Sequence, residues 1–180
     1  MTTEMTITEA LAELKTIAKR IASKRAAVTQ YLFRDAVLRD PHEANGGSKA
    51  FVAAERQALR DLRQRYANIR IAINRVNMET AVELLGTTRT IAEWIVWKRE
   101  IHTMHAEELN AIANSIKTVR TKAASLGKQI SSDKDSTGPQ DVIVNLDEAA
   151  VLKEAEELAA MLSTLDGKLS LVNATVRITV

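Results

Sequence analysis

Apolar residues recur along four long segments at the alternating three- and four-residue steps that place one apolar stripe on an α-helix. The first stripe contains Ile7, Leu11, Leu14, Ala18, Ile21, Val28 and Leu32, and only Arg25 interrupts it. In the second, Leu59, Leu62, Tyr66, Ile69, Ile73 and Val76 keep the spacing of a coiled coil or helical hairpin. The pattern predicts helices over residues 6–33, 48–78, 90–127 and 147–173.

Local signals mark the ends of these helices. Thr6 with Glu9, and Thr90 with Glu93, have the spacing of a capping box, which pairs the free amides at a helix start. Glycines and prolines lie between the helices, with Pro41 and Gly46–Gly47 in one connection, Gly86 in the next and Gly127 at a predicted C-cap.

Two short stretches have β character. Residues 141–146 are rich in β-branched side chains, and residues 174–180 alternate apolar and polar side chains. An isolated strand needs a partner, which is either the stretch at 141–146 or a second copy of the chain. We predict one all-α domain over residues 1–180, an elongated antiparallel helical bundle of coiled-coil hairpins with a short C-terminal β-strand.

Composition narrows the class of protein. The chain lacks cysteine, which excludes disulfides, thiol catalysis and cysteine-ligated metal. Its longest apolar run, residues 91–97, is interrupted by Glu93 and is too short to cross a bilayer. The N-terminus carries acidic residues and no basic region, so we expect no signal peptide, and a location in the cytoplasm or in a virion.

Charge is unevenly distributed. Residues 1–90 hold 15 Lys/Arg and 10 Asp/Glu, whereas residues 91–180 hold 10 and 13. The basic side chains of the first two helices are Lys15, Lys19, Arg20, Lys24, Arg25, Arg56, Arg60, Arg63, Arg65 and Arg70. They can follow a phosphate backbone, form a solvated face, or pair with Glu154, Glu156 and Glu157 of the fourth helix. We favour the last two interpretations over nucleic-acid binding.

The two tryptophans, Trp94 and Trp97, lie on one side of the third helix and are predicted to pack in a core or a subunit interface. An exposed strand edge is also an association site. The candidate interface residues are therefore Trp94, Trp97, Val176, Ile178 and Val180.

His102 and His105 lie one helical turn apart, with Glu108 a turn further, a spacing that can bind zinc on one helix face. A third ligand must come from elsewhere, and the remaining histidine, His42, lies in a predicted loop. We therefore expect no metal and no cofactor. Phosphate-binding loops and nucleophile motifs are absent from the sequence, so we expect no enzyme and no small-molecule substrate.

Three patches, "AINRVNMET", "GTTRTIAEWIVWKRE" and "LDGKLSLVNATVRI", resemble the septicolysin-like family of small bacterial proteins, in the same order over nearly the whole chain. Asn74, Arg75, Asn77, Gly86, Leu165, Asp166 and Asn173 match the pattern. Ala174 replaces the closing tryptophan of the family, and Arg99–Glu100 replaces its Arg-Asp pair. The resemblance implies a helical fold, and the family name implies pore formation.

The sequence thus predicts a non-catalytic, homo-oligomeric assembly protein that is a component of a phage virion or a similar particle. Its expected partners are copies of itself and other particle proteins. The two alternatives are a septicolysin-like membrane-active toxin and a helical protein that binds nucleic acid through its basic N-terminal hairpin.

Overall fold

The computed structural model describes residues 3–131 and 142–180. The chain is mostly helical with a few short strands, so the predicted all-α class is confirmed at this level. It divides into two compact units. Unit 1 comprises Met1–Thr80 and Ser170–Val180, and unit 2 comprises Ala81–Leu169. The single domain over residues 1–180 stays a prediction.

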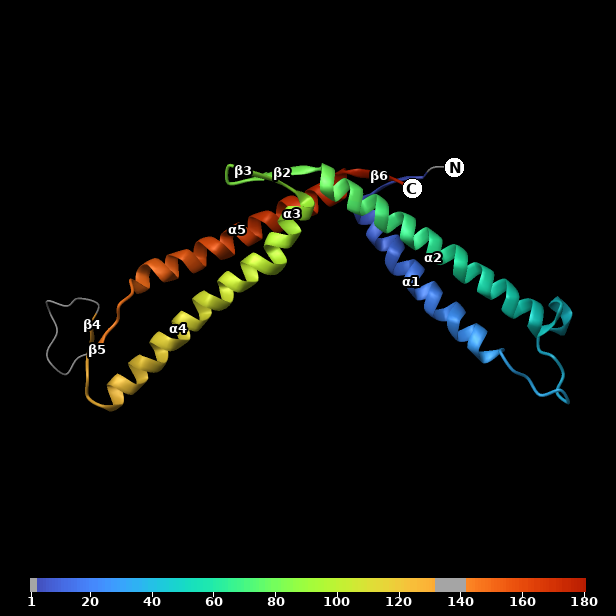
Figure 1. Ribbon diagram of the computed structural model, residues 1–180, viewed down its shortest axis with the longest axis horizontal. Coiled ribbons are helices and arrows are strands. Elements are labelled where there is room, and N and C mark those ends of the chain that lie inside the picture. The colour runs from blue at the N-terminus through green and yellow to red at the C-terminus, as the bar shows by residue number, and fades with distance from the viewer. Residues whose placement is uncertain (1–2, 132–141) are drawn as a thin grey trace. The chain divides into compact units, whose positions relative to one another are not determined.

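Unit 1 is built on helices α1 (Ile7–Gln30) and α2 (Gly47–Glu79). Lys24 near the end of α1 pairs with Glu55 near the start of α2, with 2.8 Å between Nζ and Oε1. Arg65, further along α2, pairs with Glu13 of α1, with 2.9 Å between Nε and Oε1. The two ion pairs show that the helices run antiparallel, as Figure 1 shows for the blue and green ribbons.

A two-stranded antiparallel sheet closes unit 1 at the end opposite the α1–α2 connection. Strand β1 (Glu4–Thr6) pairs with β6 (Arg177–Thr179), and Met5 lies opposite Ile178. The strand predicted within residues 174–180 is confirmed, but neither expected partner was right. Its partner is β1 of the same chain. The sequence did not reveal β1, because a strand of three residues is too short to show an alternating pattern.

The connection between α1 and α2, residues 31–46, is fixed by Asp40. Its carboxylate accepts hydrogen bonds from the Ser48 hydroxyl (2.6 Å), the Ser48 amide (2.9 Å) and the His42 amide (2.9 Å). These bonds lower the pKa of Asp40 from 3.8 to about 2, with the Ser48 hydroxyl contributing most. Asp40 therefore pairs an amide at the start of α2, whose N-cap residue is Gly46. A short 3₁₀ turn, η1 (Glu43–Asn45), completes the connection.

Unit 2 begins with a β-hairpin that the sequence analysis missed. Strands β2 (Ala81–Leu84) and β3 (Thr87–Thr90) pair antiparallel, and helix α3 (Ile91–Val96) follows directly. The Trp94 indole is buried beneath the hairpin and donates from Nε1 to the carbonyl of Val82 at 2.8 Å. The core at this end contains Val82, Leu84, Ile91, Trp94 and Leu165.

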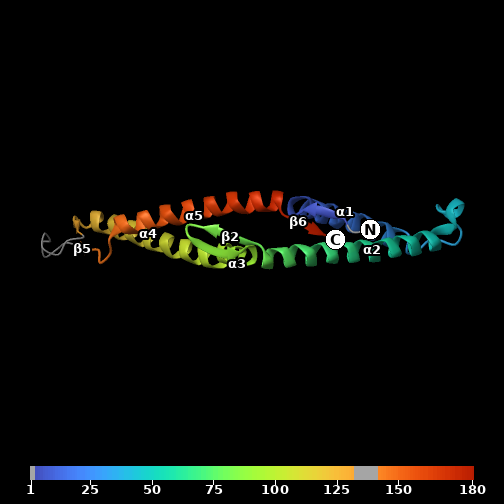
Figure 2. The same cartoon turned by 90° about the horizontal axis from the view of Figure 1, so that it is seen from above.

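The remaining helices of unit 2 are α4 (His102–Ser125) and the part of α5 (Glu148–Thr175) that precedes residue 170. Figures 1 and 2 show that they lie alongside each other, joined by the ion pair Arg120–Glu148 and by the hydrogen bond between His105 and Glu154. Gly127 has φ +65° and ends α4 as predicted. Helix α5 continues through Gly167, also as predicted, and Asp147 accepts the amides of Ala149 and Ala150 at its start.

A minor parallel pair joins β4 (Ile130–Ser131) and β5 (Val142–Ile143). The strand predicted at 141–146 is thus confirmed over its first described residues, while residue 141 lies outside the described part.

Both predicted capping boxes are present. The amides of Thr6 and Thr90 each donate to the carboxylate three residues later, and these bonds lower the pKa of Glu9 and of Glu93.

Trp94→Phe should destabilise the protein because it removes the buried hydrogen bond from the indole to the Val82 carbonyl. We expect the free energy of unfolding to fall by about 1–3 kcal/mol, measured by urea denaturation with circular dichroism. Trp97→Phe is the matched control. It removes the same group from a half-buried position and should cost less than about 1 kcal/mol. Equal losses in the two variants contradict the assignment of Trp94 to the core.

The low pKa of Asp40 determines how the stability of the fold changes with pH. Because the folded protein favours the carboxylate, Asp40 stabilises the fold at pH above its usual pKa of 3.8, and this contribution is lost as pH falls toward about 2. An NMR titration of the Asp40 carboxyl should give a midpoint of about 2. Ser48→Ala removes the main donor and should move that midpoint back toward 3.8. An unchanged midpoint in the variant contradicts this account of the loop.

Candidate interaction groove

Helix α3 passes into α4 through a single π-helical turn, η2 (Trp97–Ile101). At its end the amide of His102 donates to the carbonyl of Trp97, five residues earlier. A π-turn adds one residue to the helix, so every later residue is rotated by about 100° from its α-helical position. Ile101, the last residue of the π-turn, is 49% exposed although it lies seven residues after the buried Trp94.

The two tryptophans meet edge to face in front of this turn. Their ring centroids are 5.8 Å apart with an interplanar angle of 85°. Trp94 is fully buried, whereas Trp97 is half-buried and also contacts the His102 ring at 5.5 Å. The sequence placed both on one side of the helix, and the structure confirms that they touch. It divides their roles, since Trp94 is core and Trp97 keeps one face open.

The open face of Trp97 forms part of a groove of about 550 Å³ within unit 2. The β-hairpin contributes Leu85, the π-turn contributes Trp97, helix α4 contributes His105, and α5 forms the other side. We call this the Trp97 groove, lined by Leu85, Trp97, His105, Glu154, Glu157, Leu158, Ala160, Met161 and Thr164. Its size is that of a site for a drug-sized ligand or for a few apolar side chains.

Leu85 is the most unusual residue of the groove. It occupies the first position of the two-residue turn between β2 and β3, with φ +50°, and Gly86 follows with φ +78°. Such turns favour Asn, Asp or Gly, because a left-handed conformation costs other L-residues roughly 1–2 kcal/mol. The leucine side chain is also 76% exposed, so burial within its own chain does not offset this strain.

Charged groups lie on one rim of the groove. Glu154 pairs with His105, with 2.8 Å between Oε1 and Nε2, and Glu157 lies 3.6 Å from Lys153. These side chains are largely exposed, and such pairs contribute little to stability, so they can exchange partners readily. An apolar floor with an acidic rim suits apolar side chains accompanied by a cation. Among the lining residues, Thr164 carries the one hydroxyl group, and no base contacts it in the described structure.

The candidate interface residues fall into two groups. Trp94 and Ile178 are buried in the cores of unit 2 and unit 1, where they pack within the chain, and their place in the interface stays a prediction. Trp97, Val176 and Val180 are partly exposed. The role of these three in an interface stays a prediction.

The histidine pair does not form a metal site in the described residues. His102 packs against Trp97, and His105 binds Glu154. The third histidine, His42, belongs to unit 1, where it stacks on Phe51 with 3.9 Å between ring centroids. Residues 3–131 and 142–180 contain no group of three His, Asp or Glu side chains placed to hold a metal ion.

The basic residues of the first two helices have two kinds of surroundings. Lys24 and Arg65 form the ion pairs between α1 and α2. Arg56, Arg60, Arg63 and Arg70 lie exposed along α2 at spacings that place them on one side of the helix. Pairing with the acidic fourth helix and binding to phosphate both stay predictions.

No helix of the described residues has an apolar stretch long enough to cross a bilayer.

Comparisons with known proteins define the fold alone. No family model matches the chain, and no curated protein matches it. A crystal structure of a functionally unknown conserved protein from Corynebacterium diphtheriae is similar, with a TM-score of 0.56 at 17% identity. The similarity covers 98% of this chain and 99% of the other, so the fold recurs over both whole chains. The resemblance to the septicolysin-like family stays a prediction.

We predict that zinc does not bind tightly to the His102–His105 segment, because the two rings already have different partners. Adding zinc should leave the melting temperature unchanged, both in the unmodified chain and in a His102→Ala, His105→Ala variant. A rise in melting temperature with zinc that the double variant abolishes contradicts this prediction. The same protein should also be analysed for metal after purification without a histidine tag.

Proposed function

We propose that the chain is a non-catalytic assembly protein, and that it associates with a second copy through the Trp97 groove. The observation that carries this proposal is Leu85. A strained backbone conformation that exposes a large apolar side chain next to an apolar groove has a cost to the monomer and no benefit within it. A partner that covers Leu85 and Trp97 supplies the benefit.

Charge supports a second copy as that partner. Unit 1 holds 15 Lys/Arg and 9 Asp/Glu, a net charge of +6, whereas unit 2 holds 10 and 14, a net charge of −4. Opposite charges on two surfaces of the same chain favour contact between unit 1 of one copy and unit 2 of another. The predicted bundle and coiled-coil architecture belongs to the same proposal, since added helices cover the stripes that one pair leaves open. We further propose that these assembled copies form part of a virion or a similar particle.

Leu85→Asn tests this function because it should change stability and assembly in opposite directions. Asparagine adopts a left-handed conformation more readily than leucine, so the monomer should gain up to about 1 kcal/mol of unfolding free energy at low protein concentration. The mass in solution, measured by light scattering, should fall because the groove loses an apolar contact.

Leu171→Asn is the matched control. Leu171 is a similarly exposed leucine of α5 that does not line the groove, so its replacement should leave the mass unchanged. If the unmodified chain assembles and Leu85→Asn leaves its mass unchanged, the groove is not the site of association.

A further inference from the structure

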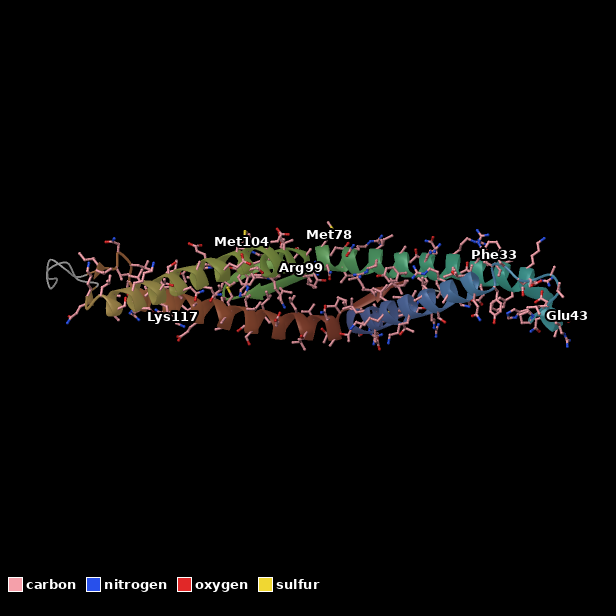
Figure 3. All side chains as sticks on the ribbon, turned by 90° about the horizontal axis from the view of Figure 1, so that it is seen from below. Phe33, Glu43, Met78, Arg99, Met104 and Lys117 are labelled. Atoms are coloured by element: carbon pink, nitrogen blue, oxygen red, sulfur yellow. The ribbon has the colours of Figure 1, made fainter. Side chains whose placement is uncertain are left out.

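The most exposed apolar side chains of unit 1 gather in the connection between α1 and α2. Phe33 is 85% exposed and Val37 is 91% exposed, and Leu32 and Leu38 are exposed beside them. We call these four side chains the loop tip. Figure 3 shows Phe33 at this end of the hairpin, extending from the ribbon. A cluster of this kind on a soluble surface marks a contact site more often than an accident of sequence.

The loop that carries the tip is ordered by its own hydrogen bonds. The Asp35 carboxylate accepts the amide of Val37 at 2.9 Å, and Arg34 lies 3.5 Å from Asp40, which is itself held by Ser48. Behind the tip, Tyr31, His42 and Phe51 pack together, with ring centroids 3.9–5.3 Å apart. The backbone that carries these apolar side chains is therefore ordered before any partner arrives, which lowers the entropic cost of binding.

We infer that the loop tip of one copy inserts into the Trp97 groove of a second copy. This inference rests on the proposed function and names the segment that occupies the groove. In the tip each apolar pair, Leu32–Phe33 and Val37–Leu38, is followed by an arginine, and the groove offers an apolar floor beside Glu154 and Glu157. Arg39 is exposed and pairs with Glu43 at the surface, so it is free to exchange that partner for a rim carboxylate.

A lipid surface fits the same loop less well. Over residues 31–46 three acidic residues, Asp35, Asp40 and Glu43, accompany the two arginines. An anionic bilayer attracts clusters of basic residues, and this loop carries no excess of them. A protein groove can instead place each charge against a separate partner.

The contact joins two different surfaces of the same chain and is therefore heterologous. After the first contact one copy keeps a free groove and the other keeps a free tip, so assembly continues until a ring closes or a filament grows. This geometry predicts assemblies of more than two copies, whereas a symmetric contact between two identical grooves stops at two.

The test uses two variants of the full chain. Phe33→Ser with Val37→Ser removes the tip but leaves the groove, and Ala160→Arg blocks the groove but leaves the tip. All three substituted side chains are exposed, so both variants should fold, which circular dichroism verifies. Light scattering should show that the unmodified chain exceeds the mass of two copies, while each variant alone stays at the mass of one.

An equimolar mixture of the two variants should form a complex of two chains and stop there, because one tip and one groove remain intact between them. A mixture that stays monomeric overturns the inference. If the groove variant alone loses assembly and the tip variant keeps it, the groove binds another segment, which overturns the inference but leaves the proposed function. A monomeric unmodified chain at high concentration overturns both.

Vesicles of anionic phospholipid provide the remaining arm of the test. The unmodified chain and the tip variant should remain in the supernatant equally when vesicles are sedimented. Sedimentation of the unmodified chain that the tip variant abolishes assigns the loop to a membrane surface and overturns the inference.

Discussion

Two helices packed side by side bury only the narrow strip of each that faces the other, and this limit governs how the rest of the chain is arranged. Along α4 the buried residues are Leu109 and Ala123, and along α5 the one buried residue is Leu165. Met104 and Leu152 of the same helices remain exposed. Unit 2 therefore gains most of its core at one end, where the β2–β3 hairpin covers the helices, whereas the buried residues of unit 1 extend along α1 from Ile7 to Ile17.

In each unit a short strand pair packs against the helices at one end. In unit 2 the hairpin β2–β3 turns the chain over Trp94, and the buried indole donates a hydrogen bond to the Val82 carbonyl of the hairpin. In unit 1 the β1–β6 pair brings Ile178 against α1 and α2 and joins the two ends of the chain. The apolar side chains of Leu85, Trp97 and the loop tip, in contrast, are partly or largely exposed.

The helices could be predicted because their signals are local. The spacing of their apolar stripes predicted the helices, and the capping boxes at Thr6 and Thr90 and the glycine at 127 predicted three of their ends. The hairpin was missed because Leu85 is not a residue that marks a left-handed turn, although the alternation of Val82 and Leu84 offered a weak signal. The groove could not be predicted, because a π-turn has no spacing signature and shifts every residue after Trp97.

The central claim is that the exposed apolar surface of one chain is covered by another. The most direct test is the mass of the unmodified chain in solution, measured by light scattering from low to high micromolar concentration. The account predicts a mass that rises with concentration above the 19.8 kDa of a single chain. A mass that stays at 19.8 kDa over the whole range would contradict it.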